Sequence, residues 1–138
     1  MESVQDHIFA LIFAGGGGTR LWPLSRKPQP QQFLKLFSKK TLLQEIFDRV
    51  KKIVKPPKIF VITRAEYVKE GKTELPLLPP ENLIAEPALR STGPAVFTGS
   101  LAIWVKDKDA IIFNVWGDHK IEDEKNYAQA VLAGAEVV

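Results

Sequence analysis

Four consecutive glycines, Gly15 to Gly18, are followed directly by Thr19 and Arg20, and this stretch has the clearest chemical potential in the chain. Glycine lets backbone N–H groups turn toward an anion because no Cβ stands in the way. The planar guanidinium of Arg20 matches the oxygens of a phosphate group. A tight turn would account for one or two glycines but poorly for four with an arginine, so the stretch favours phosphate binding.

Neither common phosphate-loop template fits this stretch. The P-loop requires a Gly-Lys-Ser/Thr ending, and no such lysine follows here. The dinucleotide fingerprint requires a third glycine where the chain has Leu21. It also requires an acidic residue at the end of the second strand, where Thr63 and Arg64 stand. An unrelated dinucleotide-binding module therefore stays open as a disfavoured alternative.

The elements that must position this loop alternate between strand and helix. Apolar runs bounded by turn residues predict strands at residues 7–14, 58–63, 82–85 and 110–116. Helical spacing predicts helices at 41–54, 94–106 and 123–138, with a capping box at Thr41 and Gln44, Pro94 in a first turn and Asp123 as an N-cap. Residues 64–81 should form a short helix and then irregular chain. The pattern predicts an α/β fold, a Rossmann-like three-layer sandwich with a mostly parallel sheet.

Asp118 follows the last predicted strand, just as the glycines follow the first. Ligands of open α/β sheets bind beyond the carboxyl ends of the strands. If the first and fourth strands are neighbours, the glycine loop and Asp118 face one crevice. Asp118 is then a candidate metal ligand, although an acidic residue in such a turn can instead cap the next helix.

Composition limits the other possibilities. The chain has 138 residues, of which 45% are hydrophobic and 25% charged, as expected for one globular domain. No apolar run near the N-terminus approaches a membrane span and no basic signal flank precedes one, so we expect a cytoplasmic protein without membrane partners. The absence of cysteine excludes disulfides and thiolate metal sites. The net charge of +3 comes with lysines on polar helix faces, which argues against nucleic-acid binding.

Three segments together resemble the mannose-1-phosphate guanylyltransferases, also called GDP-mannose pyrophosphorylases. They are AGGGGTRLWPLSR at residues 14–26, PQQFLKL at 30–36 and AEPALRSTGPA at 85–95. The glycine-rich element is shared with the wider sugar-nucleotide pyrophosphorylases, whereas WPLSR and QFL are similar to the mannose branch. The resemblance covers nearly all of the chain and implies the fold of the nucleotide-diphospho-sugar transferases.

The resemblance also implies a reaction and its partners. An oxygen of mannose 1-phosphate attacks the α-phosphorus of GTP in line, GDP-mannose forms and pyrophosphate leaves. No covalent residue is needed, so positioning, Mg²⁺ and cationic side chains carry the catalysis. The implied nucleotide-binding residues are Ala14, Gly15, Gly16, Gly18, Thr19 and Arg20. Asp118 would hold Mg²⁺, Arg20 and Asp118 would be catalytic, and His119 would be structural rather than a base.

The segment from Glu86 to Thr92 should flank the base. A carboxylate can accept hydrogen bonds from both N1–H and the exocyclic amine of guanine, which adenine cannot offer. Glu86 is therefore the candidate base reader. Arg90 could bind phosphate or pair with Glu86, and Thr92 is a further candidate contact.

The chain departs from the family pattern in three ways. Gln31 replaces a lysine expected to meet phosphate, and Lys27 is badly placed to substitute for it. Trp116 stands where the family has proline, and could narrow the crevice, stack on a ring or simply pack at a sheet edge. The family's sugar-binding half and second metal-binding acid lie downstream of the matched region.

We therefore expect residues 1–138 to be the nucleotide-binding half of a nucleotidyltransferase domain, inactive alone, which forms homo-oligomers or associates with the missing C-terminal half. The alternative is a catalytically weakened, nucleotide-sensing or regulatory partner of an intact enzyme.

Overall fold

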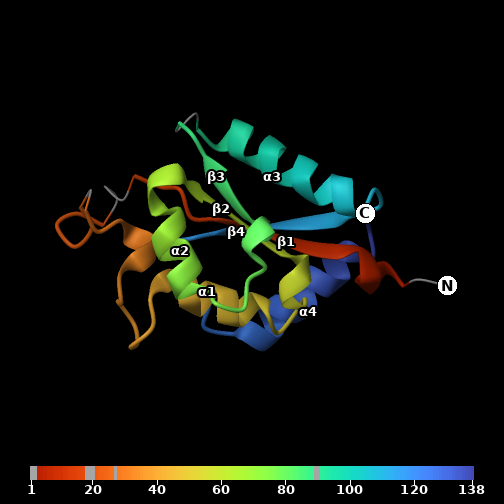
Figure 1. Ribbon diagram of the computed structural model, residues 1–138. Helices are drawn as coiled ribbons and strands as arrows, with labels where there is room; N and C mark the ends of the chain where they lie inside the picture. The colour runs from red at the N-terminus through yellow and green to blue at the C-terminus, as the bar shows by residue number, and fades with distance from the viewer. Residues whose placement is uncertain (1–2, 18–20, 27, 89–90) are drawn as a thin grey trace.

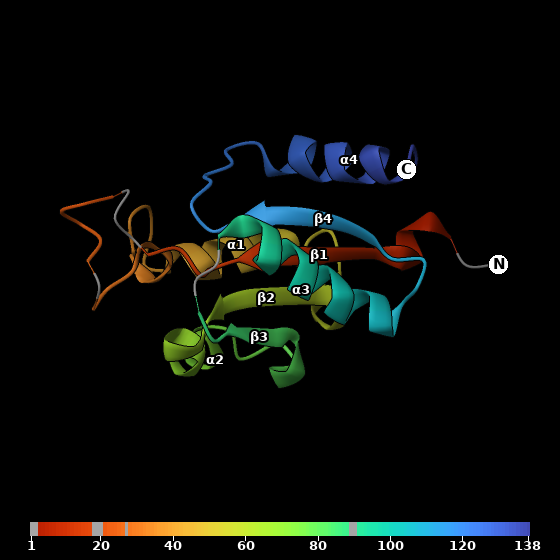
Figure 2. The ribbon, with the colours of Figure 1, turned by 90° about the horizontal axis from the view of Figure 1, so that it is seen from above.

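The structure is a computed structural model, which describes the chain except residues 1–2, 18–20, 27 and 89–90. Its centre is a sheet of four parallel strands: β1 (Ile8–Phe13), β2 (Ile59–Arg64), β3 (Leu83–Glu86) and β4 (Ile111–Trp116). Their order is β3-β2-β1-β4, as the view from above shows (Figure 2). The predicted neighbourhood of the first and fourth strands is thus confirmed, and both end at the same edge of the sheet.

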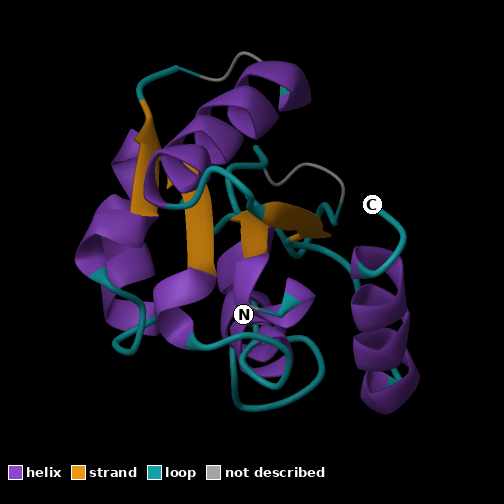
Figure 3. Cartoon of the chain, turned by 90° about the vertical axis from the view of Figure 1, so that its right-hand side faces the viewer, coloured by secondary structure: helices purple, strands orange, loops and turns teal. Residues whose placement is uncertain are grey.

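Helices cover both faces of this sheet (Figures 1 and 3). Helix α3 (Thr92–Lys106) lies on one face, over β1 and β2. Helices α1 (Leu42–Val50) and α4 (Glu124–Ala135) lie on the other face, and α2 (Val68–Glu74) packs beside β3. Short 3₁₀ helices occur at Val4–His7, Gln31–Phe33, Pro56–Lys58, Ala65–Tyr67 and Pro80–Asn82. The predicted three-layer α/β sandwich with a parallel sheet is confirmed.

The core has two halves because side chains alternate across each strand. Ile8, Ala10 and Ile12 of β1 join the apolar cluster on the α1 face. Phe9 and Leu11 join the cluster beneath α3. Strand β1 is buried over nearly its whole length, and this explains its continuous apolar sequence.

The predicted helix starts are close to those observed. Thr41 Oγ1 accepts from the backbone N–H of Gln44 at 3.3 Å, and Gln44 Oε1 accepts from that of Thr41 at 3.0 Å, so the capping box is present. The Asp123 carboxylate accepts from the backbone N–H of Asn126 at 2.9 Å as an N-cap of α4. Helix α1 ends at Val50 rather than at residue 54, where turns replace it, and α3 begins at Thr92, before Pro94. Among the described residues, no helix combines the length and apolarity needed to cross a bilayer.

Candidate functional site

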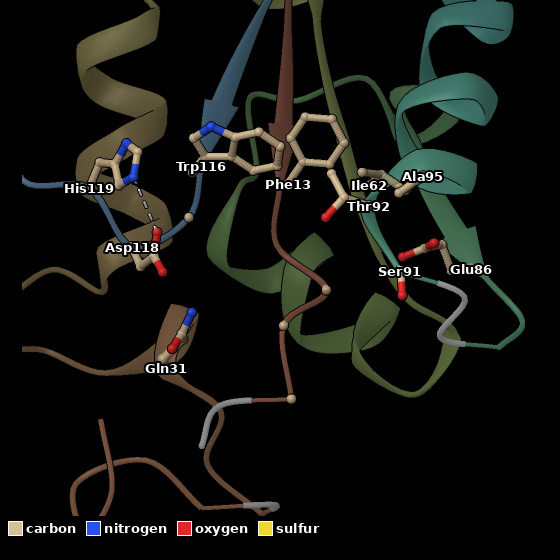
Figure 4. Close-up of a pocket in the computed structure, with 14 residues that line it drawn as sticks. Phe13, Gln31, Ile62, Glu86, Ser91, Thr92, Ala95, Trp116, Asp118 and His119 are labelled. Carbon is tan, nitrogen blue, oxygen red and sulfur yellow. Dashed lines mark ion pairs between the residues drawn. The ribbon is translucent and has the colours of Figure 1, made fainter. Parts of the chain in front are cut away.

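A crevice of about 770 Å³ lies at the edge of the sheet where the carboxyl ends of the strands meet (Figure 4). Its lining comes from segments far apart in the sequence: the loop after β1, the 3₁₀ turn at Gln31, the ends of β2, β3 and β4, and the start of α3. The lining residues are Phe13, Gly15, Gly16, Gly17, Gln31, Ile62, Glu86, Ser91, Thr92, Ala95, Trp116, Gly117, Asp118 and His119. The predicted crevice shared by the glycine loop and Asp118 is therefore present.

The glycine loop forms the floor of this crevice, and two of its glycines pass close to polar side chains. A Cβ on Gly15 would lie 3.0 Å from Glu86 Oε2, and a Cβ on Gly16 would lie 3.4 Å from Gln31 Nε2. Glycine at these positions lets the backbone approach both side chains closely. Ala14, a predicted nucleotide-binding residue, is buried and does not line the crevice; its N–H donates to the Ile62 carbonyl and its carbonyl accepts from Thr63 Oγ1.

The turn after β4 carries the candidate metal ligand. Parallel pairing places Trp116 opposite Phe13 of β1, so the next residues enter the crevice beside the glycine loop. The Asp118 side chain is only one-fifth exposed, and its Oδ1 lies 3.8 Å from His119 Nε2, whereas the His119 side chain is largely exposed. Figure 4 shows Asp118 between His119 and Gln31.

The donor chemistry of this turn suits Mg²⁺ held together with a nucleotide. Within the described ranges, no group of three His, Cys, Asp or Glu side chains could form an all-protein metal cage. Mg²⁺ is commonly bound through one or two carboxylates, with phosphate oxygens and water completing its octahedron. One carboxylate facing a crevice with a glycine-rich floor fits that arrangement.

Glu86 lies at the opposite side of the crevice from Asp118, at the end of β3 (Figure 4). Partial burial raises the pKa of the Glu86 carboxyl, and the nearby charge of Arg64 opposes that shift. Arg64 itself pairs with Glu66 at 2.9 Å. The geometry brings Glu86 into the same crevice as the glycine loop and the N-terminus of α3.

Gln31 and Trp116, the two departures in the matched region, both line the crevice. The Gln31 side chain is nearly buried, and within the described part of the chain its Oε1 has no hydrogen-bond partner. Trp116 stacks on Phe13 with ring centroids 4.6 Å apart and an interplanar angle of 28°. Packing at the strand end and narrowing of the crevice are thus compatible roles for Trp116.

An apolar wall of the crevice, formed by Phe13, Ile62 and Ala95, was not anticipated from the sequence. Each of these residues has an ordinary strand or helix pattern, and only strand pairing and the packing of α3 on the sheet bring them together. Ser91 was also missed, and its φ of 70° is unusual for a residue other than glycine. Thr92, by contrast, was expected and lies at the first turn of α3. Four predicted site residues, Gly18, Thr19, Arg20 and Arg90, lie outside the described residues.

Comparison with known proteins agrees with this architecture. The pattern of the nucleotidyl transferase family matches residues 9–136. The chain belongs to the nucleotidyl transferase family. Its relatives include mannose-1-phosphate guanylyltransferase of Escherichia coli K12, 34% identical over 131 residues, and the alginate biosynthesis protein AlgA of Pseudomonas aeruginosa, 32% identical over 122 residues. These matches cover 92% and 88% of the chain, but only 27% and 25% of the relatives' own lengths. The motif-based resemblance is thereby confirmed.

Two solved structures have the same fold as this nucleotidyl transferase family member. The first, named mannose-1-phosphate geranyltransferase and from Thermus thermophilus, has a TM-score of 0.83 and 32% sequence identity over 95% of this chain and 38% of that one. A mannose-6-phosphate isomerase from Helicobacter pylori gives a TM-score of 0.72 at 20% identity, with 95% and 46% coverage. At that identity the second match supports the fold only.

Proposed function

We propose that this chain binds GTP with Mg²⁺ and forms the nucleotide-binding half of an enzyme that makes GDP-mannose and pyrophosphate from GTP and mannose 1-phosphate. The observation that carries the proposal is the placement of two carboxylates in one crevice. Glu86 lies on one side, Asp118 on the other, and the glycine loop lies between them (Figure 4). A purine nucleotide carries its base, ribose and phosphates in the same order, so its base would lie at Glu86 and its phosphates at the glycine loop and Asp118.

The residues of the crevice would act mainly by holding two polyanions in place. An oxygen of mannose 1-phosphate forms a bond to the α-phosphorus of GTP while the bond to the pyrophosphate oxygen breaks in line. Backbone N–H groups of Gly15, Gly16 and Gly17 can donate to phosphate oxygens, and Gln31 can donate through its Nε2. Asp118 would hold Mg²⁺, which supplies charge neutralisation on the phosphates. Correct positioning of reactants is worth up to about 7 to 11 kcal/mol in such reactions.

Glu86 would distinguish guanine from adenine. The carboxylate has two acceptor oxygens for the N1–H and the exocyclic amine of guanine, whereas adenine presents an acceptor at N1. Its side chain is partly buried, so an unmatched base would leave a polar group poorly solvated. The crevice next to Glu86 is apolar at Ile62 and Ala95, which suits the faces of a base.

Nucleotide selectivity tests this proposal. Thermal unfolding should be measured with GTP, ATP and NAD at equal concentration and with Mg²⁺, because a ligand of the native state raises its stability. We expect the largest rise with GTP, and we expect Glu86→Gln to remove the difference between GTP and ATP. The matched control is Glu66→Gln, which alters an exposed carboxylate beside Arg64 outside the crevice. Equal effects of GTP and ATP on the unmodified chain would reject Glu86 as reader, and a larger effect of NAD would reject the proposed ligand.

A second candidate function is a nucleotide-sensing or regulatory partner of an intact enzyme. The neutral, nearly buried Gln31 favours it, because a lysine is expected at this place in the family. In this case a chain completed with a sugar-binding half and still carrying Gln31 would bind GTP but form no GDP-mannose. Product formation by that completed chain would instead support the enzymatic role.

A further inference from the structure

Arg49 of α1 is a buried cation that the proposed reaction does not use. Only 5% of its surface is exposed. Among the described residues, no carboxylate lies within ion-pair distance of it, although a buried charge is costly without compensation. Burial lowers the pKa of the Arg49 guanidinium, and the nearby Tyr127, Glu124 and Glu45 oppose that shift.

The contacts of Arg49 lead to the turn that carries Asp118. Its Nη2 donates to the backbone carbonyl of His119 at 3.3 Å. Its guanidinium carbon lies 5.5 Å from the centre of the Tyr127 ring of α4. Its Nε is buried and has no hydrogen-bond partner in the described part of the chain. The hydrogen bond to His119 thus fixes the backbone one residue after Asp118.

The same turn is also held on its other side. Gly117 is buried so closely against β1 that a Cβ on it would lie 2.6 Å from the Phe13 carbonyl oxygen. The backbone on both sides of Asp118 is therefore restrained, by β1 at Gly117 and by α1 at His119. We infer that Arg49 is a positioning residue, which orients the Asp118 carboxylate into the crevice for Mg²⁺. This inference rests on the proposed GTP and Mg²⁺ site.

Lys52 provides a matched control close to Arg49. It lies three residues further along the chain, in the turn that follows α1, and forms an ion pair with Glu124 at the start of α4. Both side chains are considerably exposed, and neither lines the crevice. Lys52→Met therefore removes a cation that links this end of α1 to α4, through an ion pair that does not involve the turn at Asp118.

The experiment compares Arg49→Met and Lys52→Met with the unmodified chain in two measurements. Hydrogen exchange without ligand reports on the backbone of residues 117–120 and, separately, of α4. Calorimetric titration with GTP, with and without Mg²⁺, reports on the carboxylate. We expect Arg49→Met to speed exchange at 117–120 more than in α4, and to weaken the Mg²⁺-dependent part of GTP binding by about 10- to 100-fold, as for loss of other groups that orient metal ligands. Metal-free GTP binding should be unchanged, and Lys52→Met should change none of these.

Unchanged Mg²⁺ dependence, an equal rise in exchange throughout α4, or equal loss of metal-free binding would overturn the positioning role. If the unmodified chain does not bind GTP, the proposed function fails, and the exchange measurement still shows whether Arg49 restrains the turn. If Arg49→Met does not fold, Arg49→Lys serves in its place. Lysine keeps the charge but loses the planar fork, so we expect changes in the same direction at 117–120. Wild-type behaviour of Arg49→Lys would contradict the inference.

Discussion

Gly117→Ala should disturb both the fold and the site, because Gly117 has no space for a side chain. The added Cβ would lie 2.6 Å from the carbonyl oxygen of Phe13. Close C···O contacts between adjacent strands are about 3.3 Å, so one backbone segment must move by roughly 0.7 Å. Phe13 belongs to β1, which is paired on both sides, so the turn at Gly117 is the part that moves. Overpacking of this kind costs about 1 to 3 kcal/mol of unfolding free energy.

Urea unfolding and GTP titration would measure the two consequences. The control is Gly134→Ala in α4, where a Cβ meets nothing within 4 Å. Helix propensity predicts that this control gains about 0.5 to 1 kcal/mol of stability. Gly117→Ala should lose stability and lose most of the Mg²⁺-dependent GTP binding, because Asp118 is displaced. Unchanged stability and unchanged metal dependence in Gly117→Ala would refute the idea that this close contact sets the position of the carboxylate.

Three further outcomes are expected. Asp118→Asn should weaken the Mg²⁺-dependent part of GTP binding in calorimetry and leave the metal-free part nearly intact; loss of stability with metal dependence retained would indicate a structural role in the turn, since Asp123 is the N-cap of α4. Gln31→Lys should bind GTP more tightly and with greater salt sensitivity but unfold at lower urea, since the ammonium enters a nearly buried place; unchanged affinity would show that no phosphate lies near it. Burial raises the pKa of Glu86 in the folded chain above its ordinary value of 4.5. The stabilisation that comes from keeping this carboxyl protonated is therefore complete below pH 4.5 and is lost as the pH rises through the raised pKa. Urea unfolding from about pH 4 to 7 should therefore show the unmodified chain losing stability relative to Glu86→Gln, and a constant difference would contradict this.

The fold was predictable because its signals are local. The apolar run that became β1 indicated a strand buried on both faces, and the capping box at Thr41 marked the start of α1. Parallel strands joined by helices then allow only a few strand orders in the sheet. Once β1 and β4 are neighbours, the placement of Asp118 beside the glycine loop follows from the ends of these two strands. The end of α1 was predicted less well, since Ile53 and Val54 continue the apolar spacing in turns beyond the helix.

The site was predictable only where a motif or a strand end identified it. Glu86, Gln31 and Asp118 have side chains that bind ligands, and all three line the crevice. Ile62 contributes to the same wall, but its sequence pattern is that of any core residue. Arg49 resembles an ordinary basic residue in the last turn of a helix, and only the folded chain brings it beneath the carbonyl of His119.

The central claim is that Mg²⁺ and GTP occupy the crevice between Glu86 and Asp118. The most direct test is a titration of the ¹⁵N-labelled chain with GTP and Mg²⁺, followed through its backbone amide resonances. We predict the largest shifts at residues 15–17, 86, 92 and 117–119, and almost none at the opposite edge of the sheet, where His7 pairs with Asp107. Saturable shifts that leave the crevice resonances unchanged, or no shifts at all, would contradict the account.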